Sequence, residues 1–78
     1  MQPTQTDTIV IYITVPNADE AQSLAQALVS EKLVACVNIV SGIQSVYSWQ
    51  GEIQKDSELL LICKSRTERF EALQNRVQ

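Results

Sequence analysis

Residues 33–64, LVACVNIVSGIQSVYSWQGEIQKDSELLLICK, set the topology of this chain. Both halves are rich in β-branched and aromatic residues, and the turn signal Gln50-Gly51 separates them. Ser41-Gly42 falls inside the first half, where a glycine within a strand pattern indicates a bulge or a bend rather than an end. The segment therefore predicts one long, bent β-hairpin.

A strand and a helix are expected before this hairpin. Residues 8–15 read TIVIYITV, a composition that favours a strand. Asn17 is a good helix N-cap, and Glu20 three residues later completes a variant of the capping box. The helix predicted over residues 18–32 has one apolar stripe at helical spacing, formed by Ala21, Leu24, Ala25, Leu28 and Val29.

A second helix is expected after the hairpin. Ser65 and Glu68 fit the S-x-x-E capping box, and Phe70, Leu73 and Val77 follow at the spacing of a helical stripe. The resulting order, β-α-β-β-α, is that of a ferredoxin-like split βαβ unit whose closing strand is missing from this chain. The predicted fold class is therefore α+β, with an antiparallel sheet and two helices on one of its faces.

Length and composition exclude several classes of function. The chain has 78 residues, of which 45% are apolar, and its net charge is −3. This length holds one domain, predicted over residues 8–78 after a flexible tail over residues 1–7. Six basic residues in an acidic chain argue against nucleic-acid and membrane partners. Two cysteines without a secretory signal predict free thiols and a cytoplasmic location.

The sequence carries no recognisable catalytic constellation. It has no histidine, no G-x-S-x-G nucleophile motif and no phosphate-binding loop. We therefore expect a binding or structural protein rather than an enzyme.

The return strand of the hairpin is apolar at every position from Leu59 to Cys63. A strand with one solvated face should alternate, and two helices cover only one face of the sheet. A second copy of the same sheet is the simplest cover for the other face, which predicts a homo-oligomer. The alternative is a central strand with some apolar residues simply exposed.

Two motifs resemble the signature of the CutA divalent-cation tolerance proteins. The first is the A-C-x-N-I strand over residues 35–39, and the second is the S-x-Y-x-W-x-G hairpin over residues 45–51. The resemblance covers nearly the whole chain after the tail. It implies a ferredoxin-like subunit of a homotrimer that takes part in copper and divalent-cation tolerance, binds metal ions weakly and is not an enzyme.

Cys36 and Cys63 are the candidate metal ligands, because they are the only thiols in the chain and thiolates are soft ligands. Simple register from the hairpin turn pairs Cys63 with Asn38, which would put both thiols on one face, within reach of a Cu(I) ion. A one-residue slip at Gly42 would reverse that face. Packing of both cysteines in the core is the alternative.

Tyr47 and Trp49 are two residues apart and therefore share a face near the tip of the hairpin. With Asn38 they are candidates to line a cleft for a small ligand, as in a regulatory module similar to the PII trimers. The alternative is packing against a neighbouring subunit, where both rings are favoured. A third possibility is a purely structural trimer that anchors another protein.

Two charged sets are each open to two interpretations. Carboxylates of the return strand that are separated by even numbers of residues, and so share a face, either hold a hard cation through oxygen or form a solvated surface. Cations at the start of the second helix either bind an anion or face solvent. The carboxylates are Glu52, Asp56 and Glu58, and the cations are Lys64, Arg66 and Arg69.

Overall fold

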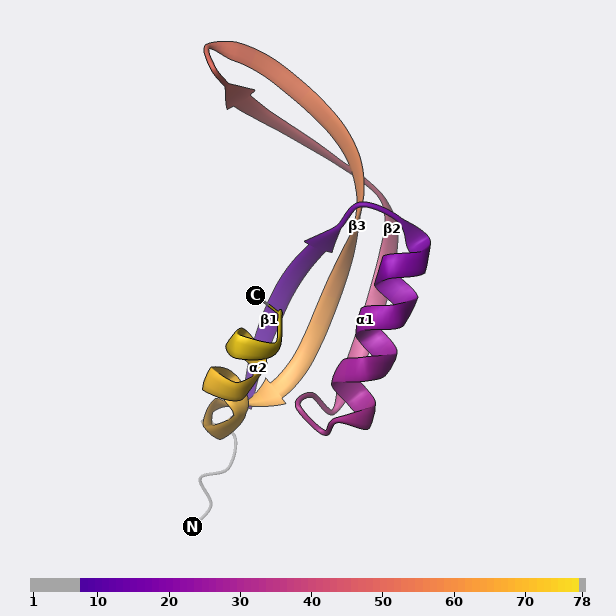
Figure 1. The fold of residues 1–78 in the computed structure, drawn as a ribbon, viewed down its shortest axis with the longest axis vertical. Coiled ribbons are helices and arrows are strands. Elements are labelled where there is room, and N and C mark those ends of the chain that lie inside the picture. Colours follow the sequence, from indigo (N-terminus) through magenta and orange to yellow (C-terminus); the bar gives the residue numbers. More distant parts are fainter. Residues whose placement is uncertain (1–7, 78) are drawn as a thin grey trace.

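The structure, a computed structural model, describes residues 8–77. Its elements are β1 (Thr8–Val15), α1 (Ala18–Ser30), β2 (Cys36–Trp49), β3 (Glu52–Arg66), the 3-10 turn η2 (Thr67–Arg69) and α2 (Phe70–Val77), as drawn in Figure 1. The strands form one antiparallel sheet in the order β1-β3-β2. Both helices contribute to a single core on one face of this sheet, so the predicted α+β ferredoxin-like architecture is confirmed. The predicted tail lies outside the described residues.

The N-terminus of α1 is capped as the sequence predicts. The Asn17 side-chain oxygen accepts a hydrogen bond from the Glu20 backbone N–H at 2.8 Å. The Asn17 amide in turn donates to the Glu20 carboxylate at 3.1 Å. The pair satisfies one of the free backbone donors of the first turn, and the two acidic residues there suit the positive end of the helix dipole.

The C-terminus of α1 lies earlier than residue 32, where the prediction put it. The Leu33 N–H donates to the Leu28 carbonyl and the Lys32 N–H donates to the Val29 carbonyl, both at 3.0 Å. Lys32 has a φ of 61°. These bonds form a Schellman motif, which ends the helix and turns the chain toward the sheet. Strand β2 consequently begins at Cys36 rather than at residue 33.

The second predicted capping box is wrong, because β3 continues through the residues assigned to it. Thr8 pairs with Arg66 and Ile9 pairs with Ser65, so both partners on β3 are still in the ladder. The Ser65 hydroxyl donates to the Leu33 carbonyl at 2.6 Å and is buried. It thus fastens the loop after α1 to the end of β3, and α2 starts only after η2.

The core lies between the helices and one face of the sheet. Its largest fully buried side chains are Leu28 of α1, Leu61 and Cys63 of β3, and Leu73 of α2. Residues of β1 and β2, including Val15 and the half-buried Ile39, pack around them. Burial of each leucine contributes roughly 2 kcal/mol. This one layer is the core of the domain, and it leaves the opposite face of the sheet uncovered.

A bulge divides the β2–β3 hairpin into two parts. Val40 is opposite Leu60, whereas Ile43 is opposite Glu58, so β2 has one residue more than β3 between these pairs. Gly42, inside the bulge, has a φ of 79°, a conformation that glycine adopts without steric cost. The register on the two sides of the bulge therefore differs by one residue.

Beyond the bulge the hairpin continues as a two-stranded arm. The ladder between β1 and β3 ends at Val15 and Leu59, so residues 43–58 pair only with each other. Figure 1 shows this arm projecting away from the helices. Gln50 and Gly51 both have positive φ, 51° and 81°, as a type I′ turn requires. The turn predicted at these two residues is confirmed.

Candidate functional site

The two cysteines lie on opposite faces of the sheet. Cys63 is opposite Val37, not opposite Asn38 as simple register predicts. The bulge at Gly42 is the cause, because it moves the register of the sheet portion by one residue and so reverses the face. Cys63 is completely buried under the helices. The expectation that both thiols share one face is therefore wrong.

Cys36 faces the side of the sheet that the helices leave open. It is half-buried, and its thiol donates to the Asn38 side-chain oxygen at 3.7 Å. Cys36 is opposite Lys64 in the ladder. Within residues 8–77, no group of three or more Cys, Asp or Glu side chains is placed to hold a metal ion. A single described chain thus offers Cys36 and Asn38 as neighbouring donors but no complete coordination shell.

The environment of Cys63 suits a packed thiol rather than a ligand. Burial raises the pKa of the Cys63 thiol, and the nearby Cys36 raises it further. The thiolate is the form that binds metals and reacts, so a raised pKa lowers both tendencies. Core packing, the alternative considered for the cysteines, accounts for Cys63.

The bulge brings four of the predicted site residues to one side of the molecule. Pairing through β3 places Tyr47 and Trp49 on the same side as Glu58, and hence on the same side as Cys36 and Asn38. Without the extra residue, the even-numbered Cys36 and Asn38 would face one side of the sheet and the odd-numbered Tyr47 and Trp49 the other. The sequence did not predict this grouping, although Gly42 is the signal that marks it.

The open face is apolar at its centre. Val10, Tyr12 and Val40 are 48%, 66% and 38% exposed, and they flank the half-buried Leu60 and Ile62 of the central strand. Cross-strand pairing makes them neighbours, since Tyr12 is opposite Ile62 and Val40 is opposite Leu60. A contiguous apolar patch on a solvated sheet marks an interaction surface.

Hydrogen bonds to carboxylates order one face of the arm. The Tyr47 hydroxyl donates to the Asp56 carboxylate at 2.6 Å, and the Ser45 hydroxyl donates to Glu58. Asp56 raises the pKa of the Tyr47 hydroxyl, chiefly by accepting a hydrogen bond from the protonated O–H. Glu52, Asp56 and Glu58 share this face, as their spacing predicts. Trp49 at the tip is 62% exposed and is therefore available for contact.

Comparison with known proteins establishes the family. The chain matches the family of CutA1 divalent ion tolerance proteins over residues 9–78. It belongs to the CutA1 family. The divalent-cation tolerance protein CutA of Thermus thermophilus is 52% identical over 69 residues, which are 88% of this chain and 67% of that protein. The resemblance inferred from the two sequence motifs is thereby confirmed.

Other CutA proteins differ in length from this chain. The chloroplastic CutA protein of Arabidopsis thaliana is 55% identical over 88% of this chain, which spans only 38% of that protein. The crystal structure of CutA1 from Oryza sativa superposes with a TM-score of 0.89 at 52% identity, over 91% of this chain and 65% of that one. These similarities show that the fold and the family are shared, and they do not by themselves assign the activity of the longer CutA proteins to this chain.

The family and its Thermus thermophilus member are named for tolerance to divalent cations, and none of the names quoted above includes a catalytic activity. They also differ in location. The plant relatives are called chloroplastic, and the structure from Archaeoglobus fulgidus is described as periplasmic. Among residues 8–77, no helix has the length and the apolar character needed to cross a membrane.

Proposed function

We propose that this chain acts in copper and divalent-cation tolerance as a cytoplasmic homotrimer that binds metal weakly through Cys36. Membership of the CutA1 family supports the role in cation tolerance. The observation that supports self-association and the metal site is the open apolar face of the sheet, with Cys36 and Asn38 on it. The partners of the chain under this proposal are other copies of itself and a metal ion.

The exposed apolar surface supports self-association. Tyr12 and Val10 project from β1, which pairs only with β3 within the described residues and so leaves one edge unpaired. A flat apolar edge beside an apolar face is a site of association unless something covers it. The arm beyond Gly42 gives a second reason, because a two-stranded hairpin is only marginally stable alone in water. A neighbouring copy would stabilise both features.

The position of Cys36 supports a metal site that depends on assembly. Soft thiolate ligands suit copper in its reduced state. One chain supplies Cys36 and the neighbouring Asn38 oxygen but no third donor of the expected kind within residues 8–77. If the open faces of several copies pack together, the Cys36 thiol and the Asn38 oxygen of each copy would lie along the shared interface. A site built in this way is completed only in the oligomer, which is consistent with weak binding by each chain.

The metal proposal is tested by titrating Cu(I) into the full-length chain in competition with a chelator. We expect saturable binding by the wild type, loss of binding in Cys36→Ser and retention in Cys63→Ala. The second variant is the matched control, because it removes the other thiol from the opposite face. Absence of saturable binding by the wild type, or equal loss in both variants, would overturn the proposal.

The assembly proposal is tested by light scattering coupled to gel filtration. We expect three chains per particle for the wild type and a smaller particle for Tyr12→Glu, which puts a charge into the open face. Val29→Glu is the control, since Val29 is exposed on α1, on the helical side. A monodisperse wild-type monomer, or dissociation by both substitutions, would contradict the proposal.

A second candidate function is a regulatory module that binds a small molecule in clefts between subunits. The CutA protein of Synechococcus elongatus has been solved in complex with a Bis-Tris molecule, which supports this alternative. In this chain Asn38, Tyr47 and Trp49 lie on one side of the ladder and are the candidate cleft residues. Trp49 is the single tryptophan, so its fluorescence reports on such a cleft. Saturable quenching by a metabolite without copper would favour this function over metal binding.

A further inference from the structure

The end of the domain opposite the arm holds a cavity with a strongly basic lining. Its volume is about 520 Å³, within the range of small-ligand sites. The lining comes from the C-terminal end of α1, the loop after it, and the junction of β3 with η2. Four cations take part in it: Lys32, Lys64, Arg66 and Arg69.

The charge at this cavity opposes the charge of the whole chain. The chain has six basic residues and a net charge of −3, yet four of the six line this one cavity. None of the described residues that line it is acidic. Glu68 lies nearby and pairs with Arg66 at 3.7 Å, but both side chains are largely exposed. An exposed pair of this kind is weak and leaves the cavity positive.

Three of the cations form no ion pair with another described residue. They are Lys32, Lys64 and Arg69. An arginine guanidinium binds a phosphate through two parallel hydrogen bonds, and a lysine ammonium adds a point charge. Together they favour an anion that carries more than one negative charge.

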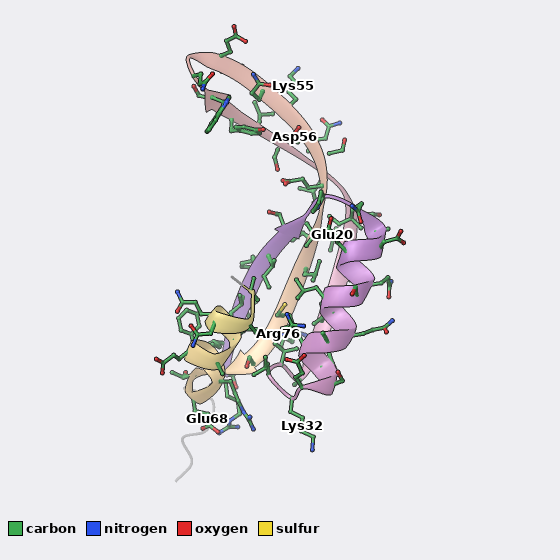
Figure 2. The ribbon with its side chains drawn as sticks, in the orientation of Figure 1. Glu20, Lys32, Lys55, Asp56, Glu68 and Arg76 are labelled. Carbon is green, nitrogen blue, oxygen red and sulfur yellow. The ribbon has the colours of Figure 1, made fainter. Side chains whose placement is uncertain are left out.

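Lys32 is placed at the cavity by an unfavourable backbone conformation. Its φ of 61° occupies the position of the Schellman motif where glycine is preferred. In Figure 2, Lys32 and Glu68 lie at the end of the molecule away from the arm, whereas Lys55 lies on the arm. A charged side chain in a place that favours glycine points to a role for the charge.

The rest of the cavity wall is apolar. Val29, Leu33 and Val34 contribute to it. The backbone N–H groups of Leu33 and Val34 already donate to the Leu28 carbonyl, and that of Ala35 donates to the Lys64 carbonyl. Recognition of an anion there falls to the side-chain cations, while the apolar wall accommodates an uncharged part of the same ligand.

We propose that this cavity is a binding site for a small organic phosphate. The phosphate group is held by Arg69 and Lys64 with help from Lys32, and the organic part packs against the apolar wall. The lining does not include Cys36, Asn38, Tyr47 or Trp49, although Lys64 is opposite Cys36 in the ladder. The variants distinguish the proposals, because phosphate binding is expected to depend on Arg69 and metal binding on Cys36.

The test is calorimetric titration of the full-length protein with phenyl phosphate and with inorganic phosphate. We expect one saturable site per chain, tighter for phenyl phosphate because of the apolar wall, and weakened by added salt. Arg69→Gln should lower the affinity for phenyl phosphate about tenfold, since it removes a charge-assisted contact. Lys55→Gln makes the same change of net charge on the arm and should leave the affinity unchanged.

A second variant separates binding from folding. Lys32→Gly should lower the affinity for phenyl phosphate but raise the melting temperature, because glycine removes the unfavourable left-handed lysine. No saturable binding by the wild type would overturn the proposal. So would equal loss of affinity in Lys55→Gln and Arg69→Gln, which would indicate attraction by net charge alone. Equal affinity for the two phosphates would exclude an organic ligand.

Discussion

Val37 lies directly opposite Cys63 in the ladder between β2 and β3, and this pairing points the Cys63 side chain toward the helices. Cys36, the residue before Val37, faces the other side of the sheet and contacts Asn38. The two thiols of one chain thus serve different layers of the molecule. One is a core residue, and the other is available on the surface that we propose to be shared between copies.

The first prediction concerns the reactivity of Cys63. In a Cys36→Ser variant, the remaining thiol should resist iodoacetamide in the native protein and react fully in denaturant, because Cys63 is completely buried. Mass spectrometry of timed samples measures the labelled fraction. Native labelling at the rate of the denatured chain would show that Cys63 is not in the core.

The second prediction concerns alkaline pH. Burial holds the pKa of the Cys63 thiol above its ordinary value in the folded state. Above the ordinary value of about 8.5, the unfolded chain releases this proton while the folded chain keeps it, so deprotonation favours unfolding. The stability contributed by Cys63 is complete below that pH and is lost as pH rises through the raised pKa. Urea denaturation across this range should show the decline.

The matched control for this pH dependence is Cys63→Ala, which has no thiol to ionise at this position. Its stability is expected to be lower at neutral pH and to fall less steeply above pH about 8.5. Parallel curves for the wild type and the variant would exclude Cys63 as a source of the alkaline destabilisation.

The third prediction concerns the bulge. Gly42→Ala should destabilise the protein by about 1 kcal/mol, because an L-residue with a side chain resists a positive φ. Apart from Gly42 and its two chain neighbours, no residue has an atom within 4 Å of the added methyl group, so the cost comes from the local backbone conformation. Gly42→Asn should lose less, since asparagine tolerates this conformation. Thermal unfolding compares the two, and an equal loss would contradict the assignment of left-handed strain.

The fourth prediction concerns the bond from Ser65 to the Leu33 carbonyl. Ser65→Ala should cost about 1.5 kcal/mol, because it leaves a shielded carbonyl without a donor. Ser57→Ala on the exposed part of β3 is the comparison and should change stability little. Denaturant midpoints measure both. An equally small effect at Ser65 would mean that water replaces the lost donor.

Much of the fold was predictable from local patterns, and the failures have identifiable causes. The Asn17 cap and the turn at Gln50-Gly51 follow from side-chain and backbone preferences of a few neighbouring residues, and both are confirmed. Ser65 matches a cap pattern equally well, but pairing with β1 retains it in the sheet. Local chemistry does not reveal which of two tertiary roles a serine takes.

The candidate site was harder to predict, because it depends on register. Tyr47 and Trp49 share a face as their spacing predicts, but their relation to Cys36 and Asn38 depends on how many residues the bulge adds. Gly42 signals that a bulge is present without giving its length. The basic cavity posed a similar problem, since Lys32 is far in sequence from Lys64 and Arg69 and joins them only through the loop after α1.

The extra residue beside Gly42 also restricts how the length of this segment can change in evolution. Insertions that lengthen both strands of the arm equally preserve which side each residue faces, so the reach of the arm can vary freely. A one-residue insertion or deletion in a single strand would turn all residues of that strand on one side of the change to the opposite face of the ladder. Only a second irregularity in the strand would compensate for it. Natural length variants of this arm are therefore expected to differ by matched changes in its two strands.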